Sequence, residues 1–199
     1  MPAPTIYYIR HGETAWNAEG RFQGSQDIPL NDLGRRQAAG AGGILADLFA
    51  RDGRGESALT FVASPLGRAR STMELVRGVL QWPANDYAID DRLREIGYGR
   101  WEGSTLAQMQ ASDPEIFAAR LRDKWSVSPP DGESYASVQA RMSDWYNQLT
   151  TDTVAVAHGG TARALMVVLG VETSDSAADL AIEQGAVYVF SEGGLRKYS

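Results

Sequence analysis

The chain contains two histidines, and glycine follows each of them at the end of an apolar run. His11 lies in "YYIRHGETAWN" after residues 6–9, and His158 lies in "TVAVAHGGTAR" after residues 154–157. A neutral imidazole can attack a phosphoryl group or transfer a proton near neutral pH. Either histidine taken singly is more typical of a hydrogen-bonded structural residue than of a catalyst. Two matching His-Gly corners favour a shared chemical role.

Two arginines indicate the charge of the ligand. Arg10 precedes His11, and Arg68 follows a third apolar run in "TFVASPLGRAR". Guanidinium groups supply planar forks of donors that suit phosphate oxygens, and helix N-termini add oriented N–H groups. In an open parallel α/β sheet, ligands bind outside the carboxyl ends of the strands. The sequence therefore predicts one phosphate pocket formed by Arg10, His11, Arg68 and His158.

Cleavage of a phosphate ester also needs a group that protonates the departing alkoxide. The segment "DRLREIGYGRWEG" offers two carboxylates, Glu95 and Glu102, in a stretch rich in glycine and aromatic residues. The same segment is also typical of a surface loop held by Tyr98 and Trp101. Periodicity alone does not choose between the two acids.

Composition excludes several classes of protein. The chain has no Cys, which removes disulfides, thiolate nucleophiles and Cys-based zinc sites. A zinc site on two histidines without a His-x-x-x-His spacing would need carboxylates from elsewhere. The net charge of −6 argues against nucleic acid as a partner, because such proteins need a basic field. Any bound anion must be met by a local cluster of arginines.

The elements that position these residues alternate between strands and helices. Four short apolar runs predict buried strands: Ile6–Ile9, Thr60–Ala63, Val154–Ala157 and Val187–Phe190. Segments with helical spacing separate them, which predicts an α/β fold with a mainly parallel sheet. With 199 residues, of which 43% are hydrophobic, we expect a single domain over residues 1–199.

Capping signals indicate where the helices begin. Side chains that cap helices precede three segments, twice with proline next: Ser64 with Pro65, Asp113 or Ser112 with Pro114, and Ser134. A longer helix is expected from about Asp32 to Phe49. It contains Gly40, Gly42 and Gly43, each costing about 0.5–1 kcal/mol relative to alanine, so packing must hold it or it kinks.

The N-terminus "MPAPTIYYIR" lacks the basic region and the long apolar segment of a secretory signal. No run reaches the roughly 18 apolar residues that a membrane span requires. We therefore expect a cytoplasmic protein without a membrane partner. Whether it is a monomer or a homodimer is left open.

Five motifs, in order along almost the whole chain, resemble those of the histidine phosphatase superfamily, in the branch that includes cofactor-dependent phosphoglycerate mutases. They are "IRHGETAWN", "SPLGRARST", "LREIGYGRWEG", "PDGESYASVQARM" and "VAHGGTARAL". The resemblance implies a three-layer α/β/α sandwich and a reaction that needs neither metal nor cofactor.

The resemblance also implies a role for each residue. His11 matches the nucleophile, which is transiently phosphorylated, and Glu95, in preference to Glu102, matches the proton donor. The other matches surround the phosphate or the substrate: Arg10, Arg68, His158 and Gly159, then Asn17, Gln23 and Gly24. Because Glu95 must be protonated in the first step, we expect its carboxyl to be partly desolvated.

Three functions of the protein are consistent with a small phosphorylated substrate. A phosphomonoesterase is favoured, because "YGRWEG" resembles the phosphatase members, the segment Gly103–Asp131 is compact and the tail "GLRKYS" is short. The alternatives are a phosphoglycerate mutase and a non-catalytic phosphate-ligand binder, which would not need both nucleophile and acid. We expect the distal side of the pocket to come from Gln23–Leu30 and Gly103–Asp131, including Trp125.

Overall fold

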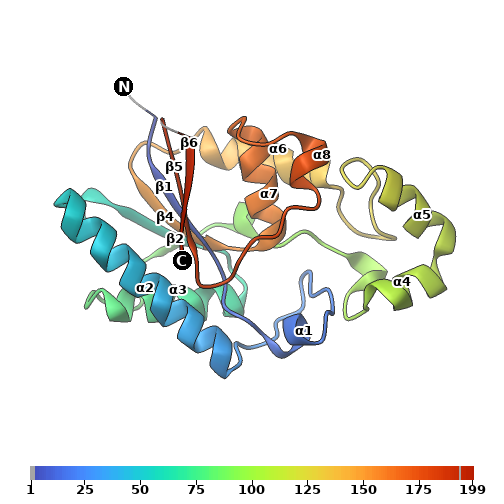
Figure 1. The fold of residues 1–199 in the computed structure, drawn as a ribbon, viewed down its shortest axis with the longest axis horizontal. Helices are drawn as coiled ribbons and strands as arrows, with labels where there is room; N and C mark the ends of the chain where they lie inside the picture. The colour runs from blue at the N-terminus through green and yellow to red at the C-terminus, as the bar shows by residue number, and fades with distance from the viewer. Residues whose placement is uncertain (1–2, 193) are drawn as a thin grey trace.

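A six-stranded sheet of order β3-β2-β4-β1-β5-β6 forms the centre of the structure, a computed structural model that describes residues 3–192 and 194–199 (Figure 1). The strands are β1 (Ile6–Arg10), β2 (Thr60–Ala63), β3 (Ala88–Ile89), β4 (Thr153–Ala157), β5 (Val187–Ser191) and β6 (Gly194–Tyr198). β3, β2, β4 and β1 are parallel, whereas β5 runs antiparallel to β1 and β6 antiparallel to β5. The predicted mainly parallel sheet is confirmed.

Helices cover both faces of this sheet, so the fold has the three predicted layers (Figure 1). They are α1 (Ala15–Ala18), α2 (Asp32–Asp52), α3 (Gly67–Val79), α4 (Leu106–Ser112), α5 (Pro114–Arg122), α6 (Tyr135–Tyr146), α7 (Gly159–Val168) and α8 (Ser174–Ala177). Alternate β1 side chains point to opposite faces. Tyr7 and Ile9 pack with residues of α2 and α3, and Ile6 and Tyr8 pack with residues of α6 and α7.

The long helix α2 is continuous through Gly40, Gly42 and Gly43 and extends past the predicted end at Phe49. Asn31 caps its start by accepting from Gly34 N, and Gly53 ends it in the left-handed conformation at φ 63°. A Cβ on Gly42 would lie 2.8 Å from Cβ of Val79, so this glycine lets α2 approach α3 closely. Packing holds the helix, as its composition requires.

The predicted start of α3 at Ser64 and Pro65 is wrong, because the helix begins at Gly67. Asp27, from a distant loop, accepts from Gly67 N at 2.8 Å and so supplies the cap that Ser64 was expected to give. Ser64 is used elsewhere: its Oγ lies 2.7 Å from Nε2 of His158. The serine therefore serves the neighbouring strand end.

The other predicted helix starts agree with the structure. Ser134 caps α6 by accepting from Ser137 N. Asp113 precedes Pro114 at the start of α5, but its side chain makes no cap hydrogen bond there. Its carboxylate instead accepts from Trp101 Nε1 at 2.7 Å. Asp113 therefore links α5 to the segment that contains Glu95.

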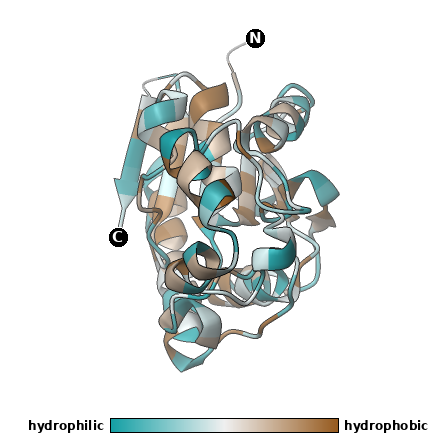
Figure 2. Cartoon of the chain, turned by 90° about the vertical axis from the view of Figure 1, so that its right-hand side faces the viewer, coloured by the Kyte–Doolittle hydropathy of each residue, from teal (hydrophilic) through white to brown (hydrophobic). Residues whose placement is uncertain are grey.

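Strands β3 and β6 were not predicted, because neither carries a strong apolar pattern. Both residues of β3 are exposed. β6 contains Arg196 and Lys197, and Figure 2 shows the arrow that leads to the C-terminus in the teal of hydrophilic residues. Charged residues on an edge strand hinder pairing with another chain.

Within the described ranges, no helix has the combination of length and apolar sequence needed to cross a bilayer.

Candidate active site

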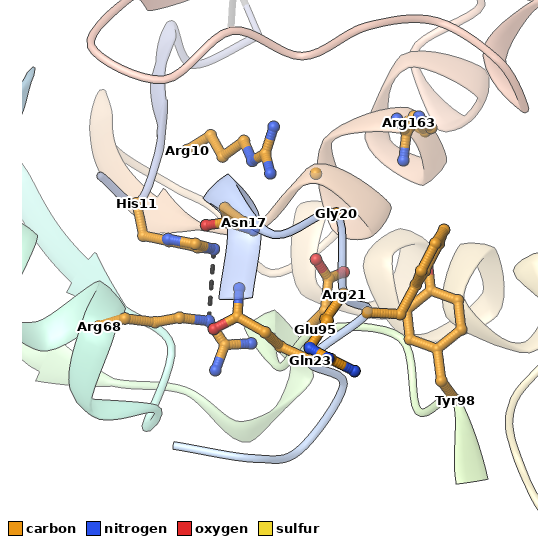
Figure 3. A pocket seen from close by; sticks show the side chains of 12 residues that line it. Arg10, His11, Asn17, Gly20, Arg21, Gln23, Arg68, Glu95, Tyr98 and Arg163 are labelled. Atoms are coloured by element: carbon orange, nitrogen blue, oxygen red, sulfur yellow. Dashed lines mark hydrogen bonds between the residues drawn. The ribbon is translucent and has the colours of Figure 1, made fainter. Parts of the chain in front are cut away.

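The loops that follow β1, β2 and β4 meet at one edge of the sheet, as the sequence predicts. They border a cavity of about 240 Å³. Its walls are formed by Arg10, His11, Asn17, Gly20, Arg21, Phe22, Gln23, Arg68, Glu95, Tyr98, Gly159 and Arg163. Figure 3 shows Arg10, His11 and Arg68 arranged around one side of this cavity and Glu95 near its centre.

His11 is only 1% exposed and has a defined tautomer. Its Nδ1 lies 2.7 Å from the carbonyl oxygen of Gly12, which can only accept, so Nδ1 carries the proton. Its Nε2 accepts from Nε of Arg68 at 3.3 Å (Figure 3). Burial, followed by the charges of Arg68 and Arg10, holds the pKa of His11 well below its ordinary value. The imidazole is therefore neutral near pH 7, with the Nε2 lone pair on the cavity side.

Gly12 allows close packing of the backbone next to His11. A Cβ on Gly12 would lie 2.2 Å from the carbonyl oxygen of Gly34, near the start of α2. The absent side chain thus lets the helix start approach the backbone beside His11. Asn31 N donates to the carbonyl of Glu13 at 2.9 Å and reinforces this contact.

Arg68 and Arg10 bond to neutral acceptors. Arg68 is 1% exposed, and its Nη1 and Nη2 donate to the carbonyls of Gln26 and Gly24 at 2.6 and 2.8 Å. Arg10 is half-buried and donates from Nη1 to the carbonyl of Ile182 at 2.7 Å. Neither forms an ion pair with any acid of the described chain. Two such cations side by side favour an anion between them.

His158 lies directly behind His11. Their ring centroids are 5.1 Å apart at an interplanar angle of 60°. Burial, with the positive charge of Arg68 next in size, holds the pKa of His158 well below its ordinary value. Nε2 contacts Ser64, and the buried Nδ1 has no hydrogen-bond partner among the described residues.

Glu95 lines the cavity and is half-buried. Its Oε1 accepts from Gly160 N at 3.0 Å and from Ile96 N at 2.9 Å. A Cβ on Gly160 would lie 2.4 Å from that oxygen, so only glycine allows this contact. The N-terminus of α7 thus positions the carboxylate.

The backbone around Glu95 is held by a charged pair. Arg141 on α6 donates to the carbonyls of Arg92 and Glu95 and also pairs with Glu133. Glu133 accepts in turn from Gly97 N at 2.9 Å. The Arg141–Glu133 pair therefore fixes the segment at both ends.

Glu102, the other carboxylate considered, is not among the cavity-lining residues. It accepts from Ser25 N and Ser25 Oγ at 2.9 and 2.8 Å, and from Gln26 Nε2 at 3.1 Å. The loop that it holds supplies the carbonyls that accept from Arg68. Glu102 therefore acts on the cavity through this loop and through Tyr98, whose N–H donates to its Oε1 at 3.3 Å.

Asn17 and Gln23 line the cavity with amide groups. Oδ1 of Asn17 accepts from Gln184 Nε2 at 3.0 Å and from Thr14, so its NH₂ group is the part left for a ligand. Oε1 of Gln23 accepts from Thr14 Oγ1 at 3.0 Å, which leaves its NH₂ group in the same way.

The two predicted glycines have different positions. Gly159 lines the cavity at the start of α7. Gly24 does not, and its carbonyl accepts from Arg68. Gly24 adopts φ 53°, and a Cβ there would meet Oε1 of Glu102 at 2.0 Å. Gly24 therefore contacts Arg68 from outside the cavity lining.

The expected distal wall was wrong in part. No residue of Gly103–Asp131 lines this cavity. Trp125 is 9% exposed and stacks on Tyr135 at 5.1 Å between centroids, so it belongs to the core. The residues that sequence reasoning missed are Gly20, Arg21, Phe22, Tyr98 and Arg163.

A signal for one of these missed residues was present in the sequence. Arg163 lies four positions after Gly159, the spacing that places two residues on one face of a helix.

No group of three or more His, Cys, Asp or Glu side chains that could hold a metal ion occurs in the part of the chain that the structure describes.

Comparison with known proteins identifies the family. The family model of the histidine phosphatase superfamily (branch 1) matches residues 6–196. The chain belongs to this superfamily. The match to the histidine phosphatase model includes all three strand ends that border the cavity, together with Glu95.

Relatives that differ in activity resemble this chain. A glucosyl-3-phosphoglycerate phosphatase of Mycolicibacterium vanbaalenii is 35% identical over 183 residues, covering 85% of this chain and 75% of that protein. A 2,3-bisphosphoglycerate-dependent phosphoglycerate mutase of Beijerinckia indica is 30% identical over 193 residues, covering 93% and 90%. A bifunctional protein of Mycobacterium tuberculosis is 36% identical over 137 residues, but this chain spans only 35% of its length.

A solved histidine phosphatase superfamily structure shares the fold. It is a mycobacterial glucosyl-3-phosphoglycerate phosphatase in complex with VO3. The TM-score is 0.79 and the identity 30%, with 98% of each chain covered.

Proposed function

We propose that this chain is a phosphatase that hydrolyses small phosphate esters through a phosphohistidine on His11. The observation that carries the proposal is the Nε2 lone pair of His11, which borders the same cavity as the unpaired guanidiniums of Arg10 and Arg68. A neutral nucleophile beside two cations is the arrangement that attack on a phosphate dianion requires.

In the first step, Nε2 of His11 forms a bond to phosphorus while the bond to the ester oxygen breaks. The proton stays on Nδ1 and remains hydrogen-bonded to the carbonyl oxygen of Gly12. The partial negative charge of that oxygen stabilises the cationic phosphohistidine. The carboxyl of Glu95 gives its proton to the departing alkoxide. In the second step, water attacks phosphorus while the Nε2–phosphorus bond breaks and its electron pair returns to Nε2. Glu95 takes a proton from this water, inorganic phosphate leaves, and His11 is neutral again.

The charge that gathers on the equatorial phosphoryl oxygens is offset by Arg10 and Arg68. Gly159 begins the ten-residue helix α7, so its N-terminal N–H groups add a positive dipole end on the same side. His158 completes this surrounding as a neutral imidazole held by Ser64. The VO3 complex of the related phosphatase adds support for an oxyanion-binding site in this fold.

A phosphoglycerate mutase is the second candidate, favoured by the likeness to the Beijerinckia indica mutase over 93% of this chain. A mutase shares the first step but returns the phosphoryl group to another hydroxyl of the substrate. The two functions differ only in whether water or a hydroxyl accepts the phosphoryl group.

Incubation of the purified chain with p-nitrophenyl phosphate and with 3-phosphoglycerate separates the candidates. We expect release of inorganic phosphate from both and no 2-phosphoglycerate by ³¹P NMR. Rapid formation of 2-phosphoglycerate without phosphate release would identify a mutase instead.

A labelling experiment tests the intermediate. With ³²P-labelled ester, we expect acid-labile, base-stable label on the wild-type chain and none on the His11→Ala variant. Saturable binding of ester with neither label nor turnover would identify a non-catalytic binder and contradict the proposal.

A further inference from the structure

Arg163 is a third cation beside the proposed phosphoryl site. It lies on α7, is half-buried and lines the cavity. A Cβ built on Gly159 would lie 3.6 Å from Nε of Arg10 and 3.7 Å from Nη1 of Arg163, so the two guanidiniums flank this glycine. In Figure 3, Arg10 and Arg163 both lie in the upper part of the view, and Arg68 lies below them.

The contacts of Arg163 leave its charge uncompensated. Nε donates to the carbonyl of Leu180 at 2.8 Å, and Nη1 donates to the hydroxyl of Tyr135 at 3.0 Å. Both acceptors are neutral, and no ion pair joins Arg163 to an acid within residues 3–192 and 194–199. By contrast, Arg21, which also lines the cavity, pairs with Glu19 at 2.7 Å.

One nitrogen of Arg163 remains available. Nη2 makes no hydrogen bond to a described residue and is not among the buried unpartnered atoms, so it is accessible to solvent on a residue that lines the cavity. Because Nε and Nη1 are already fixed, the guanidinium is preorganised and loses little side-chain entropy when Nη2 binds an acceptor.

A second guanidinium without an ion pair in the described chain packs near the ring of Tyr135. Arg120 is 7% exposed, its Cζ lies 5.8 Å from the Tyr135 ring centroid, and its buried Nη2 has no partner in the described chain. Tyr98, which lines the phosphate cavity, also lines an adjoining cavity of about 200 Å³ that Arg120 borders. Arg120 is too buried to bind a ligand directly, but its charge adds to the positive field around Arg163.

The cavity has more positive charges from arginine than one phosphate group needs. Arg10 and Arg68 already provide two guanidiniums for the phosphoryl group. Arg163 repels Arg10, and Glu95 is a carboxyl group of this cavity whose charge acts on both arginines. We propose that Arg163 determines specificity by binding a second anionic group, a carboxylate or another phosphate, on the alcohol part of the ester. This inference rests on the proposed phosphatase function, in which Arg10 and Arg68 hold the reacting phosphate.

Two esters that differ only in the second charge provide the test. 3-Phosphoglycerate carries a carboxylate where glycerol 3-phosphate carries a hydroxymethyl group. For the wild-type chain, we expect kcat/KM for 3-phosphoglycerate to exceed kcat/KM for glycerol 3-phosphate about tenfold or more, mainly because KM is lower. Fructose 1,6-bisphosphate compared with fructose 6-phosphate tests whether a second phosphate serves equally well.

The Arg163→Gln variant should lose this preference, because its kcat/KM for 3-phosphoglycerate should fall about tenfold or more beyond any fall in its kcat/KM for glycerol 3-phosphate. Arg163→Lys keeps the charge without the planar fork, so it should retain part of the preference. Arg35→Gln, at an exposed position on α2 outside the cavity, is the matched control and should behave as wild type. Circular dichroism and thermal melting check that each variant folds; if the Gln variant does not, the Lys variant decides.

Binding without turnover separates failure of this inference from failure of the phosphatase proposal. Calorimetric titration of the His11→Ala chain with each ester should show the same preference, and Arg163→Gln in that background should remove it. Equal losses for both esters, or no wild-type preference in rate or binding, would overturn the role of Arg163. Preferential binding without hydrolysis of any ester would support Arg163 and contradict the phosphatase proposal.

Discussion

Nε of Arg68 donates to Nε2 of His11 over 3.3 Å, which joins the first turn of α3 to the end of β1. The contact keeps a proton off Nε2, because the Nε2 lone pair accepts from the Arg68 guanidinium, which also lines the cavity. It also places a cation where a phosphoryl oxygen would lie during attack. One arginine thus orients the nucleophile and offsets the charge of its target.

Replacement of this arginine should therefore reduce the rate more than the affinity. For Arg68→Lys we expect kcat for p-nitrophenyl phosphate to fall about 10²–10³-fold, the size seen when one transition-state donor is removed. Lysine keeps the charge but lacks the fork that also binds Gln26 and Gly24. Steady-state kinetics measure the effect, and a kcat within threefold of wild type would contradict this role.

The hydroxyl of Ser64 should stabilise the fold through His158. Ser64→Ala leaves Nε2 of the buried His158 without its partner at 2.7 Å, so we expect a loss of about 1–3 kcal/mol in the free energy of unfolding. Urea denaturation measures this loss. Ser71→Ala, at an exposed position on α3, is the control and should change stability by less than about 0.5 kcal/mol. Equal stability of the two variants would contradict the prediction.

The two buried histidines should make stability depend on pH. Their pKa values are held well below the ordinary 6.5, chiefly by burial. Below about pH 6.5 the unfolded chain binds protons that the folded chain does not, so stability falls as the pH falls and is constant above that point. Each histidine contributes up to about 1.4 kcal/mol per pH unit.

The His11→Gln variant isolates one of these contributions. Urea denaturation at pH 7.5, 6.0 and 5.5 should give a shallower loss of stability for the variant than for wild type. Carboxylates titrate in both proteins, so their effect cancels in the comparison. Parallel curves would show that protonation of His11 is not linked to folding.

Gly160 should matter most for substrates whose leaving group needs a proton. In Gly160→Ala, the new Cβ would lie 2.4 Å from Oε1 of Glu95 and 2.7 Å from Cγ2 of Ile96, so the carboxyl must move. We expect an alkyl ester to lose about 10²-fold or more in kcat. p-Nitrophenyl phosphate should lose much less in kcat, because its leaving group, p-nitrophenolate, departs without a proton.

Gly43→Ala is the matched control for this substitution, because nothing lies within 4 Å of the Cβ that it adds. It should leave both rates unchanged and stabilise α2 by about 0.5–1 kcal/mol. If Gly160→Ala slowed both esters equally, Glu95 would not be the group that protonates the leaving oxygen.

The sequence predicted the parts of the site that lie at strand ends. β1, β2 and β4 carry clear apolar runs, and the polar residues after them could be placed together because parallel strands share a carboxyl edge. Glu95 could be chosen over Glu102 only by resemblance, because both lie in one irregular segment. The structure separates them: only Glu95 borders the cavity.

The parts that sequence missed depend on contacts between distant segments. The cap on α3 comes from Asp27, forty positions before Gly67, and no local pattern encodes it. Trp125 resembles a pocket residue by type, but stacking on Tyr135 places it in the core. Arg163 shares a helix face with Gly159, yet its significance depends on the nearby Arg10.

The contact between Gly12 and Gly34 has a consequence for how the chain tolerates mutation. A Cβ on Gly34 would lie 2.1 Å from the carbonyl oxygen of Glu13, just as one on Gly12 would collide with Gly34. In a deep mutational scan for activity, position 34 should therefore be as intolerant as a residue of the reaction centre. Sequence drift in α2 is constrained by the backbone beside His11, although Gly34 itself does not line the cavity.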